Sequence, residues 1–482
     1  MGCAASSLPT ELALPENPQG ALSWLPARVR AAGSIDLWNS SDGQRRTLLR
    51  SLASMCQATT VTEALEEVRA LMSLGNGTLN LMAYAYMRML FAKNPELYYA
   101  TLLAKPSELL PVVYTPTVGL ACQNFGKMPF YRRGCYLGVA DKGRLKAVLE
   151  AYAASELTKK SASGKFVVDC IVFSDGGRIL GLGDLAAWGM GIPIGKLDLY
   201  TVCSGVDPYA TIPVILDAGA YDASGNTDKL LVRDHSSYTG DTRERETHIS
   251  EAGTVVNSCF YGEGNLIHEF MQAATELFTS NVGGVPLLQF EDFNSNDAFP
   301  LLAEYRDKYL TYNDDIQGTA SVAVAALLGA IRISNGGTTD LIDELKKHVF
   351  LFHGAGSANV GAAALLVGEA GVPRSQVFMT NSRGVIWQAA DGKSGSFRNA
   401  EQQQFAQIGE PSGYDPTDLV STIAYLKPTV LCGAVVRPPE MGTRGQLRRP
   451  CFASVCRLSL SPCCLRRGAR RAASHKRSSR PS

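Results

Sequence analysis

The sequence of 482 residues has few charged side chains, no long apolar run and no secretory signal. Charged residues make up 19% and hydrophobic residues 45%, a balance that argues against a disordered or fibrous protein. No apolar run reaches the length expected of a membrane-spanning helix. Four residues interrupt any hydrophobic stretch of a secretory signal near the N-terminus: Pro9, Glu11, Pro15 and Glu16. The length and these absences favour an intracellular enzyme of two or three domains.

Paired cysteines and C-terminal acids are also scarce. Most of the twelve cysteines are scattered singly, which indicates buried reduced thiols rather than a disulfide framework. Residues 436–482 hold 12 of the 46 Lys and Arg residues but a single acid, Glu440. Without helical or strand periodicity, this segment is expected to be a disordered basic extension. A nucleic-acid binding module is a less favoured interpretation, because Phe452 is the segment's one aromatic residue for base stacking. We therefore expect no nucleic-acid partner.

Two acidic stretches lack histidine and cysteine altogether. They are Q-F-E-D-F (289–293) and N-D-D-I-Q-G-T-A (313–320). Each holds two carboxylates in apolar or small-residue surroundings: Glu291, Asp292, Asp314 and Asp315. Such carboxylates are costly to bury unless a cation or hydrogen bonds compensate them. Oxygen ligands alone favour Mg2+ or Mn2+ over Zn2+. Acid pairs in loops or at helix N-caps are an equally good interpretation of the pattern.

One glycine-rich segment joins an apolar run to a small-residue helix pattern. The strand V-F-L-F-H (349–353) leads into the turn Gly354, Ala355, Gly356, Ser357 and Ala358. A glycine turn at a helix N-terminus lets backbone N–H groups approach a pyrophosphate. A second strand, Gln376 to Thr380, follows at the interval of a βαβ unit, so the sequence predicts dinucleotide binding. The third glycine position holds Asn359, with Gly361 two residues on. A plain αβ connection is the alternative.

The end of that second strand lacks the acid that usually contacts the adenine ribose. Asn381, Ser382 and Arg383 stand there instead. Without the acid a 2′-phosphate meets no repulsion, and Arg383 could pair with it. The pattern favours NADP over NAD, and a solvent-facing loop arginine is the other interpretation.

From about Leu81 to Ala434 the sequence resembles the malic enzymes, the oxidative decarboxylases of malate. Besides the two acidic stretches, the segments that carry the resemblance are V-V-Y-T-P-T-V-G-L-A-C-Q (112–123), D-G-G-R-I-L-G-L-G-D-L (175–185) and G-M-G-I-P-I-G-K-L-D-L-Y-T (189–201). The resemblance implies oxidative decarboxylation of malate to pyruvate and CO2, with reduction of NAD(P)+ and a requirement for Mg2+ or Mn2+. It also implies a homodimer or homotetramer.

The resemblance further implies roles for individual residues. Three acids match the family's metal ligands: Glu291, Asp292 and Asp315. Three residues match its catalytic groups: the lysine Lys196, the tyrosine Tyr114 and the acid that accompanies the lysine, Asp314. Arg178 matches the arginine that binds a substrate carboxylate. Gly354 and Gly356 match the cofactor turn.

The expected fold is α/β, in four segments. Residues 1–111 should be mostly helical, residues 112–318 a catalytic α/β domain, residues 319–435 a Rossmann-type dinucleotide-binding domain and residues 436–482 the basic extension. No family-like segment follows Lys427 to Val436, so the Rossmann domain is expected to be incomplete. Two alternative functions remain open. One is a truncated, inactive pseudoenzyme or an assembly partner of full-length malic enzyme, and the other is a malolactic-type decarboxylase without net redox change.

The first six residues, M-G-C-A-A-S, fit an N-myristoylation signal with a palmitoylation site at Cys3. Membrane contact is expected only if Gly2 and Cys3 are acylated, because two lipid chains are needed for stable attachment. An unacylated start is the plainer interpretation, and the expected location is the cytoplasm.

Overall fold

The structure is a computed structural model that describes residues 56–73, 77–125, 133–157, 159–180, 182–219, 247–249, 255–262, 264–334, 340–434 and 459–460. The predicted acylation sites, Gly2 and Cys3, lie outside the described residues, as does most of the basic extension. Acylation therefore stays a prediction. The cytoplasmic location and the domain boundaries also stay predictions. Two residues of the extension form a strand, β16 (Ser459–Leu460), although the sequence shows no strand periodicity there.

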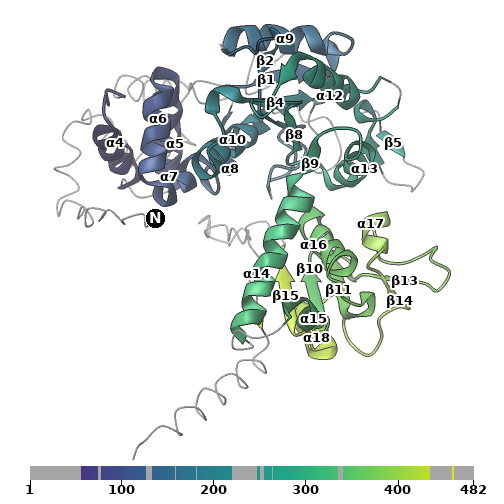
Figure 1. The fold of residues 1–482 in the computed structure, drawn as a ribbon. Helices are drawn as coiled ribbons and strands as arrows, with labels where there is room; N and C mark the ends of the chain where they lie inside the picture. The colour runs from purple at the N-terminus through teal and green to yellow at the C-terminus, as the bar shows by residue number, and fades with distance from the viewer. Residues whose placement is uncertain are drawn as a thin grey trace, which may run out of the picture. The chain divides into compact units, whose positions relative to one another are not determined.

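The chain folds into two compact units. The first unit takes its described residues from 1–133 and 194–208, and the second unit takes the others. The first unit is helical, as the N-terminal amphipathic patterns predict. Its helices are α4 (Val61–Ser73), α5 (Gly77–Lys93), α6 (Pro95–Ala104), α7 (Pro106–Val113), α8 (Thr117–Gln123) and most of α10 (Gly191–Ser204) (Figure 1). Helix α6 begins where Asn94 accepts the N–H of Leu97 at 2.9 Å and a proline fills the first turn.

A buried ion pair crosses the first unit. Arg88 Nη2 on α5 lies 2.6 Å from Asp198 Oδ2 on α10, and the two side chains are 2% and 0% exposed. The hydroxyls of Tyr98 and Tyr99 on α6 donate to the same carboxylate at 2.7 and 3.0 Å. Burial raises the pKa of Asp198, and Arg88 opposes that rise. These contacts tie α10 to both α5 and α6.

The second unit contains a five-stranded parallel sheet in the order β1-β4-β3-β8-β9. The strands are β1 (Cys135–Gly138), β3 (Cys170–Ser174), β4 (Thr211–Asp217), β8 (Leu287–Phe290) and β9 (Thr311–Asn313). Helices α9 (Leu145–Glu156) and α12 (Leu266–Leu277) lie side by side against it, and α13 (Ser295–Tyr305) follows β8 (Figure 1). Both faces of β3 and β4 are buried, which explains their continuous apolar sequences.

The second unit also holds a dinucleotide-type sheet in the order β12-β11-β10-β15-β16. Strands β10 (Phe350–His353), β11 (Val377–Asn381) and β15 (Val430–Gly433) are parallel, whereas β12 (Gly384–Val385) and β16 are antiparallel to their neighbours. The helices are α14 (Thr319–Ser334), α15 (Leu341–Leu345), α16 (Ser357–Gly368) and α18 (Leu419–Leu426). The predicted strands at 349–353 and 376–380 are confirmed as β10 and β11.

Shorter elements complete the two units. They are η3 (Val139–Asp141), β2 (Phe166–Val167), η4 (Ala186–Met190), η5 (Pro208–Ala210), β5 (Thr247–Ile249), β6 (Val255–Asn257), η6 (Ser258–Phe260), β7 (Phe278–Thr279), η7 (Asp314–Gly318), η8 (Arg374–Gln376), β13 (Trp387–Gln388), α17 (Ala400–Gln403) and β14 (Gln407–Ile408).

One helical stretch contradicts the expectation about apolar length. Asp314–Ser334, made of η7 and α14, is long and apolar enough to cross a membrane by length and composition alone. The expectation was wrong because small residues such as Ser321 and Gly329 interrupt the apolar run but add little polarity. Four side chains of α14 belong to the core of the dinucleotide-type sheet: Ala320, Ala323, Leu327 and Ile331. The core helix of a globular domain meets the same criteria, so this stretch alone does not indicate a membrane span.

No disulfide joins the seven cysteines in the part of the chain that the structure describes, and five of these cysteines are buried. Burial raises the pKa of the Cys135 and Cys170 thiols to about 12. Both thiols are therefore protonated and unreactive at neutral pH.

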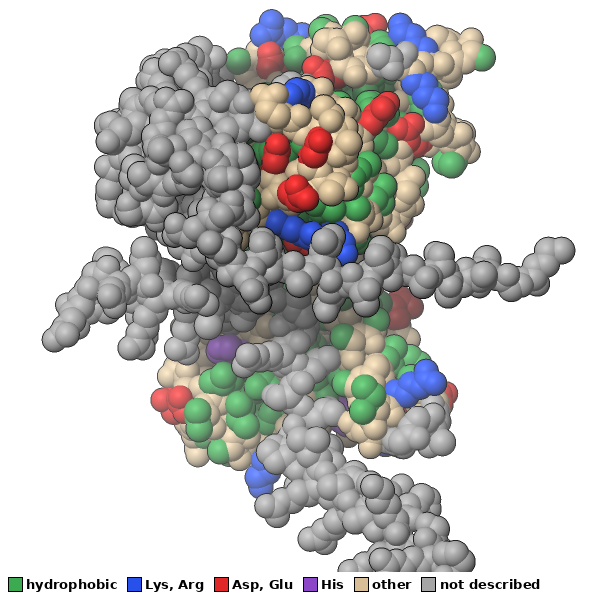
Figure 2. All heavy atoms as spheres, turned by 90° about the vertical axis from the view of Figure 1, so that its left-hand side faces the viewer, with side chains coloured by type: hydrophobic (Ala, Val, Ile, Leu, Met, Phe, Trp, Pro, Cys, Tyr) green, Lys and Arg blue, Asp and Glu red, His purple; other side chains and the backbone are tan. Residues whose placement is uncertain are grey.

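Charged side chains of both signs share the face drawn in Figure 2. On the upper coloured part several Asp and Glu side chains lie close together, with Lys and Arg side chains above and below them. Mixed charge of this kind is usual for a surface that remains in water.

Candidate active site

The acidic residues of the second unit follow two neighbouring parallel strands. Glu291 and Asp292 come directly after β8, and Asp314 and Asp315 come directly after β9. In the register of the two strands Phe290 pairs with Asn313, so both acid pairs leave the sheet at the same edge. The carboxyl ends of parallel strands are where α/β proteins place their ligands.

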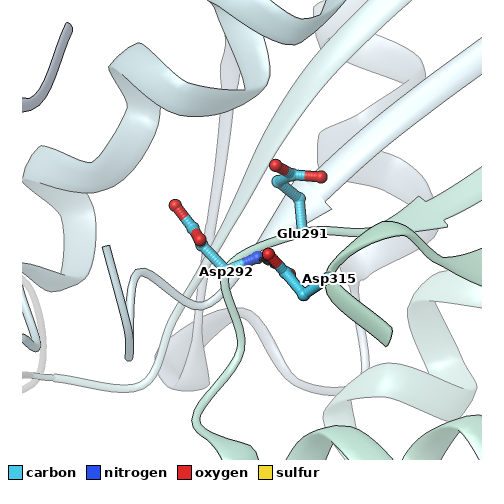
Figure 3. Close-up of side chains that lie close together, drawn as sticks. All are labelled: Glu291, Asp292 and Asp315. Carbon is cyan, nitrogen blue, oxygen red and sulfur yellow. Dashed lines mark hydrogen bonds between the residues drawn. The ribbon is translucent and has the colours of Figure 1, made fainter. Parts of the chain in front are cut away.

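Three of these acids come together. Glu291, Asp292 and Asp315 each offer a carboxylate oxygen, and these atoms all lie within 4.8 Å of one another. Figure 3 shows Glu291 and Asp292 leaving adjacent positions of one segment, with Asp315 facing them from another. Glu291 and Asp292 are 3% and 6% exposed. Three largely buried carboxylates repel one another unless a cation compensates them, and an all-oxygen set suits Mg2+ or Mn2+. The residues present therefore fit the metal that the sequence predicts.

The backbone around the three acids is held in place by hydrogen bonds. The N–H of Asp292 donates to Asp315 Oδ2 at 2.7 Å, which joins the two acidic stretches directly. Gln289 Nε2 donates to Glu291 Oε2 at 2.6 Å, and Tyr312 OH donates to Gln289 Oε1 at 3.0 Å. These bonds orient Glu291 from within the sheet. Asp292 has a φ of 54°, a left-handed conformation that is strained for a residue other than glycine.

The second acid pair lies in a single π-helical turn, η7. Asn313 fixes the start of the turn, because its Oδ1 accepts the N–H of Ile316 at 3.1 Å. At the end of the turn, a Cβ on Gly318 would lie 2.1 Å from Asp314 Oδ1. Gly318 therefore leaves room for the Asp314 carboxylate. Isolated π-helical turns of this kind are frequent at functional sites.

Arg178 lies in a tight loop after β3 that is bonded to the backbone of Asp292. Ser174 Oγ accepts the N–H of Gly176 at 2.9 Å, and Asp175 Oδ1 accepts the N–H of Gly177 at 2.8 Å. The N–H of Arg178 then donates to the carbonyl oxygen of Asp292 at 3.0 Å. A Cβ at Gly176, whose φ is 68°, would lie 2.1 Å from the backbone oxygen of Ala186, so only glycine fits there. The loop fixes the backbone of Arg178 beside Asp292.

Tyr114 and Lys196 belong to the first unit. Lys196 Nζ on α10 lies 5.4 Å from the centroid of the Tyr114 ring, within the range of a cation–π contact. A Cβ on Gly195 would lie 2.5 Å from Tyr114 Cδ2, so this glycine allows the ring to pack against α10. The structure thus brings the predicted lysine and tyrosine together in one unit, and the predicted acids and Arg178 together in the other.

The glycine turn lies between β10 and α16, as the sequence predicts. Gly354 has a φ of 97°, and a Cβ on Gly356 would contact nothing within 4 Å, which leaves this backbone open. Helix α16 then begins at Ser357, so the backbone N–H groups of its first turn, which includes Ala358, face the turn. Asn359 is buried, and its Nδ2 donates to the carbonyl oxygens of His353 and Gly354 at 3.2 and 2.6 Å. The residue that departs from the glycine fingerprint therefore braces the turn.

The segment after β11 forms a polar network. Asn381 Oδ1 accepts the N–H of Arg383 at 2.8 Å, and Arg398 Nη2 donates to Ser382 Oγ. Gln402 connects this segment to the glycine turn, because its Oε1 accepts from Asn381 Nδ2 at 3.1 Å and its Nε2 donates to the carbonyl oxygen of Ala355 at 2.9 Å. Two arginines thus flank Ser382 where the adenine ribose of a dinucleotide lies in such folds.

Comparison with known families shows where this arrangement belongs. Residues 91–306 match the model of the malic enzyme N-terminal domain, and residues 316–441 match that of the malic enzyme NAD binding domain. The chain belongs to the malic enzyme family. The α/β fold with a dinucleotide-binding domain is confirmed by the same matches.

Several malic enzymes are similar over most of this chain. The mitochondrial NADP-dependent malic enzyme of Homo sapiens is 40% identical over 362 residues, which are 73% of this chain and 52% of the human protein. NADP-dependent malic enzyme 2 of Arabidopsis thaliana is 36% identical over 381 residues, 77% of this chain and 56% of the plant protein. The chain spans about half the length of the curated relatives it matches. The match to the crystal structure of the Entamoeba histolytica malic enzyme covers 74% of this chain and 59% of that chain, at 19% identity. Its TM-score of 0.38 is too low to support a conclusion.

Two polar residues of this malic enzyme family member were not found from its sequence. Arg398 and Gln402 follow β11 at a distance, in a stretch whose pattern shows only polar loop residues. No spacing rule connects them to Ser382 or Ala355, and only the folded loop brings them there. The individual roles of the predicted site residues stay predictions.

Proposed function

We propose that the chain catalyses the metal-dependent oxidative decarboxylation of malate to pyruvate and CO2 with reduction of NADP+. The observation that carries the proposal is the convergence of Glu291, Asp292 and Asp315 within 4.8 Å at the carboxyl edge of a parallel sheet, where the backbone N–H of Arg178 donates to the carbonyl oxygen of Asp292. Family membership supports the reaction class.

The residues of the chain divide the chemistry among them. The guanidinium of Arg178 pairs with a carboxylate of malate and fixes its orientation. Lys196 takes the proton of the C2 hydroxyl. Tyr114 donates a proton to C3 of the enol that remains after CO2 leaves. When bound, a divalent ion supplies Lewis acidity at the C2 oxygen and the dinucleotide supplies the hydride acceptor.

The preference for NADP rests on the loop after β11. The residues at the end of β11 and just after it, Asn381, Ser382 and Arg383, include no acid, and Arg383 and Arg398 both flank Ser382. Charge-assisted bonds from arginine to phosphate are among the stronger hydrogen bonds in proteins. The similar human and plant proteins are both named NADP-dependent. Homo-oligomers, as the resemblance implies, stay a prediction.

The test of the reaction uses the purified 482-residue chain with malate and Mn2+. NADPH and NADH formation are followed in separate reactions, and pyruvate and lactate are quantified at the end. We expect NADPH and pyruvate in equal amounts, and we expect Asp315→Asn to lose more than about 100-fold of the activity, because outer-sphere changes alone cost about 10- to 100-fold. A folded wild-type chain without turnover would refute the proposal. Lactate without net NADPH would replace it with the malolactic reaction.

The test of cofactor choice uses Arg398→Gln and Arg383→Gln. Each should raise KM for NADP+ about tenfold or more and leave KM for NAD+ nearly unchanged, because only NADP+ carries the 2′-phosphate. Arg332→Gln, an exposed change on α14, is the matched control. Equal effects on both cofactors would contradict the assignment of these arginines.

A further inference from the structure

Helix α16, which begins at the glycine turn, packs directly on the turn that carries Asp315. Gly361 is buried in α16. A Cβ built on it would lie 2.4 Å from the carbonyl oxygen of Ile316 and 3.1 Å from the carbonyl carbon. Ile316 follows Asp315 immediately in η7. The absence of a side chain at Gly361 is therefore what lets the helix and the turn approach this closely.

A side chain at position 361 could not displace the backbone of Ile316 without moving the rest of η7. The N–H of Ile316 donates to Asn313 Oδ1, and the carbonyl oxygen of Ile316 accepts the N–H of Thr319. Asp315 itself accepts the N–H of Asp292 at 2.7 Å. A displacement of the Ile316 backbone would therefore move η7 as a body, together with the Asp315 carboxylate.

A second contact joins the same helix to the other acidic stretch. Ser357 Oγ, in the first turn of α16, donates to Ser295 Oγ at 3.2 Å. Ser295 begins α13, three positions after Asp292. Helix α16 thus contacts both chain segments that carry the three acids.

We propose that Gly361 is a positioning residue for the metal site: its bare Cα sets the distance between α16 and η7 and thereby the place of the Asp315 carboxylate. The inference rests on the proposed function, since it requires a divalent ion at Glu291, Asp292 and Asp315. Helix α16 then connects the glycine turn at its N-terminus with the metal ligands beside it.

The size of the effect follows from the distances. To reach ordinary van der Waals contact, the 2.4 Å gap must widen by about 1 Å when a methyl group is added. Metal–ligand distances tolerate a deviation of only about 0.2 Å. Gly361→Ala should therefore weaken Mn2+ binding, by about 10- to 100-fold, as changes next to a ligand typically do.

The experiment is a Mn2+ titration of the full chain without cofactor or substrate, followed by the electron paramagnetic resonance signal of the free ion. Gly368→Ala is the matched control, because Gly368 is an exposed residue in the same helix and a Cβ on it would contact nothing within 4 Å. Both variants replace a glycine of α16 with alanine. Only Gly361→Ala should raise the Mn2+ dissociation constant, while its circular dichroism spectrum stays that of the wild type.

Asp315→Asn separates failure of the inference from failure of the proposed function. If it loses Mn2+ binding while Gly361→Ala binds as the wild type does, the inference is overturned and the metal site stands. If the wild type binds no Mn2+, or Asp315→Asn binds it normally, both are overturned.

A second measurement needs no variant and covers the case in which Gly361→Ala does not fold. In the wild-type chain, saturating Mn2+ should slow hydrogen exchange both in η7 and in the first turns of α16. Slowing confined to η7 would overturn the inference.

Discussion

Replacing Arg88 by methionine should destabilise the first unit by about 3–5 kcal/mol, because it leaves the buried Asp198 carboxylate without the cation bonded to it, and only the nearby Arg133 remains. The pair is buried and closely spaced, like the ion pairs whose disruption costs this much. The side chains are 2% and 0% exposed, and the nitrogen and oxygen are 2.6 Å apart. Arg88 also lies over the ring of Tyr98, 4.7 Å from its centroid, so the change removes a cation–π contact as well.

The double variant Arg88→Met with Asp198→Asn should be less destabilised than either single variant. With the charges of Arg88 and Asp198 both gone, neither residue of the pair is left as an unpaired buried ion, and removing both partners of a buried pair is often nearly neutral. Asparagine is the right partner because its Oδ1 can still accept from Tyr98 and Tyr99, which donate to Asp198 at 2.7 and 3.0 Å. Arg69→Met is the control, because the Arg69–Glu108 pair is 24% and 32% exposed and should contribute only about 0.2–1 kcal/mol.

Hydrogen exchange of peptides from α5 and α6 is the appropriate assay, because it reports the opening of this unit apart from the other. A loss of 3 kcal/mol corresponds to exchange about 150-fold faster, since every 1.4 kcal/mol is tenfold. If the two single effects add in the double variant to within about 0.5 kcal/mol, the two side chains are not coupled and the reasoning is refuted. An Arg88 effect no larger than that of Arg69 would refute it equally.

Two further predictions concern the second unit. Glu269 on α12 accepts the N–H groups of Gly143 and Leu145 at 2.8 and 2.9 Å where α9 begins, so Glu269→Ala should lower the urea midpoint by the equivalent of about 1–2 kcal/mol, and an unchanged midpoint would show that water replaces the cap. Burial lowers the pKa of His348 below its unfolded value of about 6.5, so the unfolded state binds the proton more readily and this histidine removes stability as pH falls below 6.5. His348→Asn should therefore lose less stability than the wild type between pH 7.5 and 5.5 in urea titrations, and identical pH slopes would contradict the assignment.

The sequence was sufficient for elements whose physical cause is local. The apolar runs of β10 and β11, with glycines between them, predicted a βαβ unit because a buried parallel strand leaves no polar alternation. The acids at 291–292 and 314–315 were recognisable because carboxylates rarely stand in such surroundings. Their meeting in space depended on the register of β8 with β9, which no local pattern encodes.

The features that the sequence did not reveal arise from contacts between distant segments. Arg398 contacts Ser382 because of how its loop folds, and the amino-acid pattern of that loop is the same as in any polar loop. Gly361 looked like a displaced fingerprint glycine, whereas its neighbour is the carbonyl oxygen of Ile316.

Asn359 restrains the glycine turn in a way that a third glycine would not. Its amide ties the carbonyl oxygens of His353 and Gly354 together before any ligand arrives. The loop conformations that a dinucleotide would otherwise have to select are thus excluded during folding, and the entropy lost on binding is smaller. The glycine turn is thus preorganised, because the Asn359 side chain holds it in one shape before any ligand binds. Even a small fragment such as a pyrophosphate should bind to it without rearranging it.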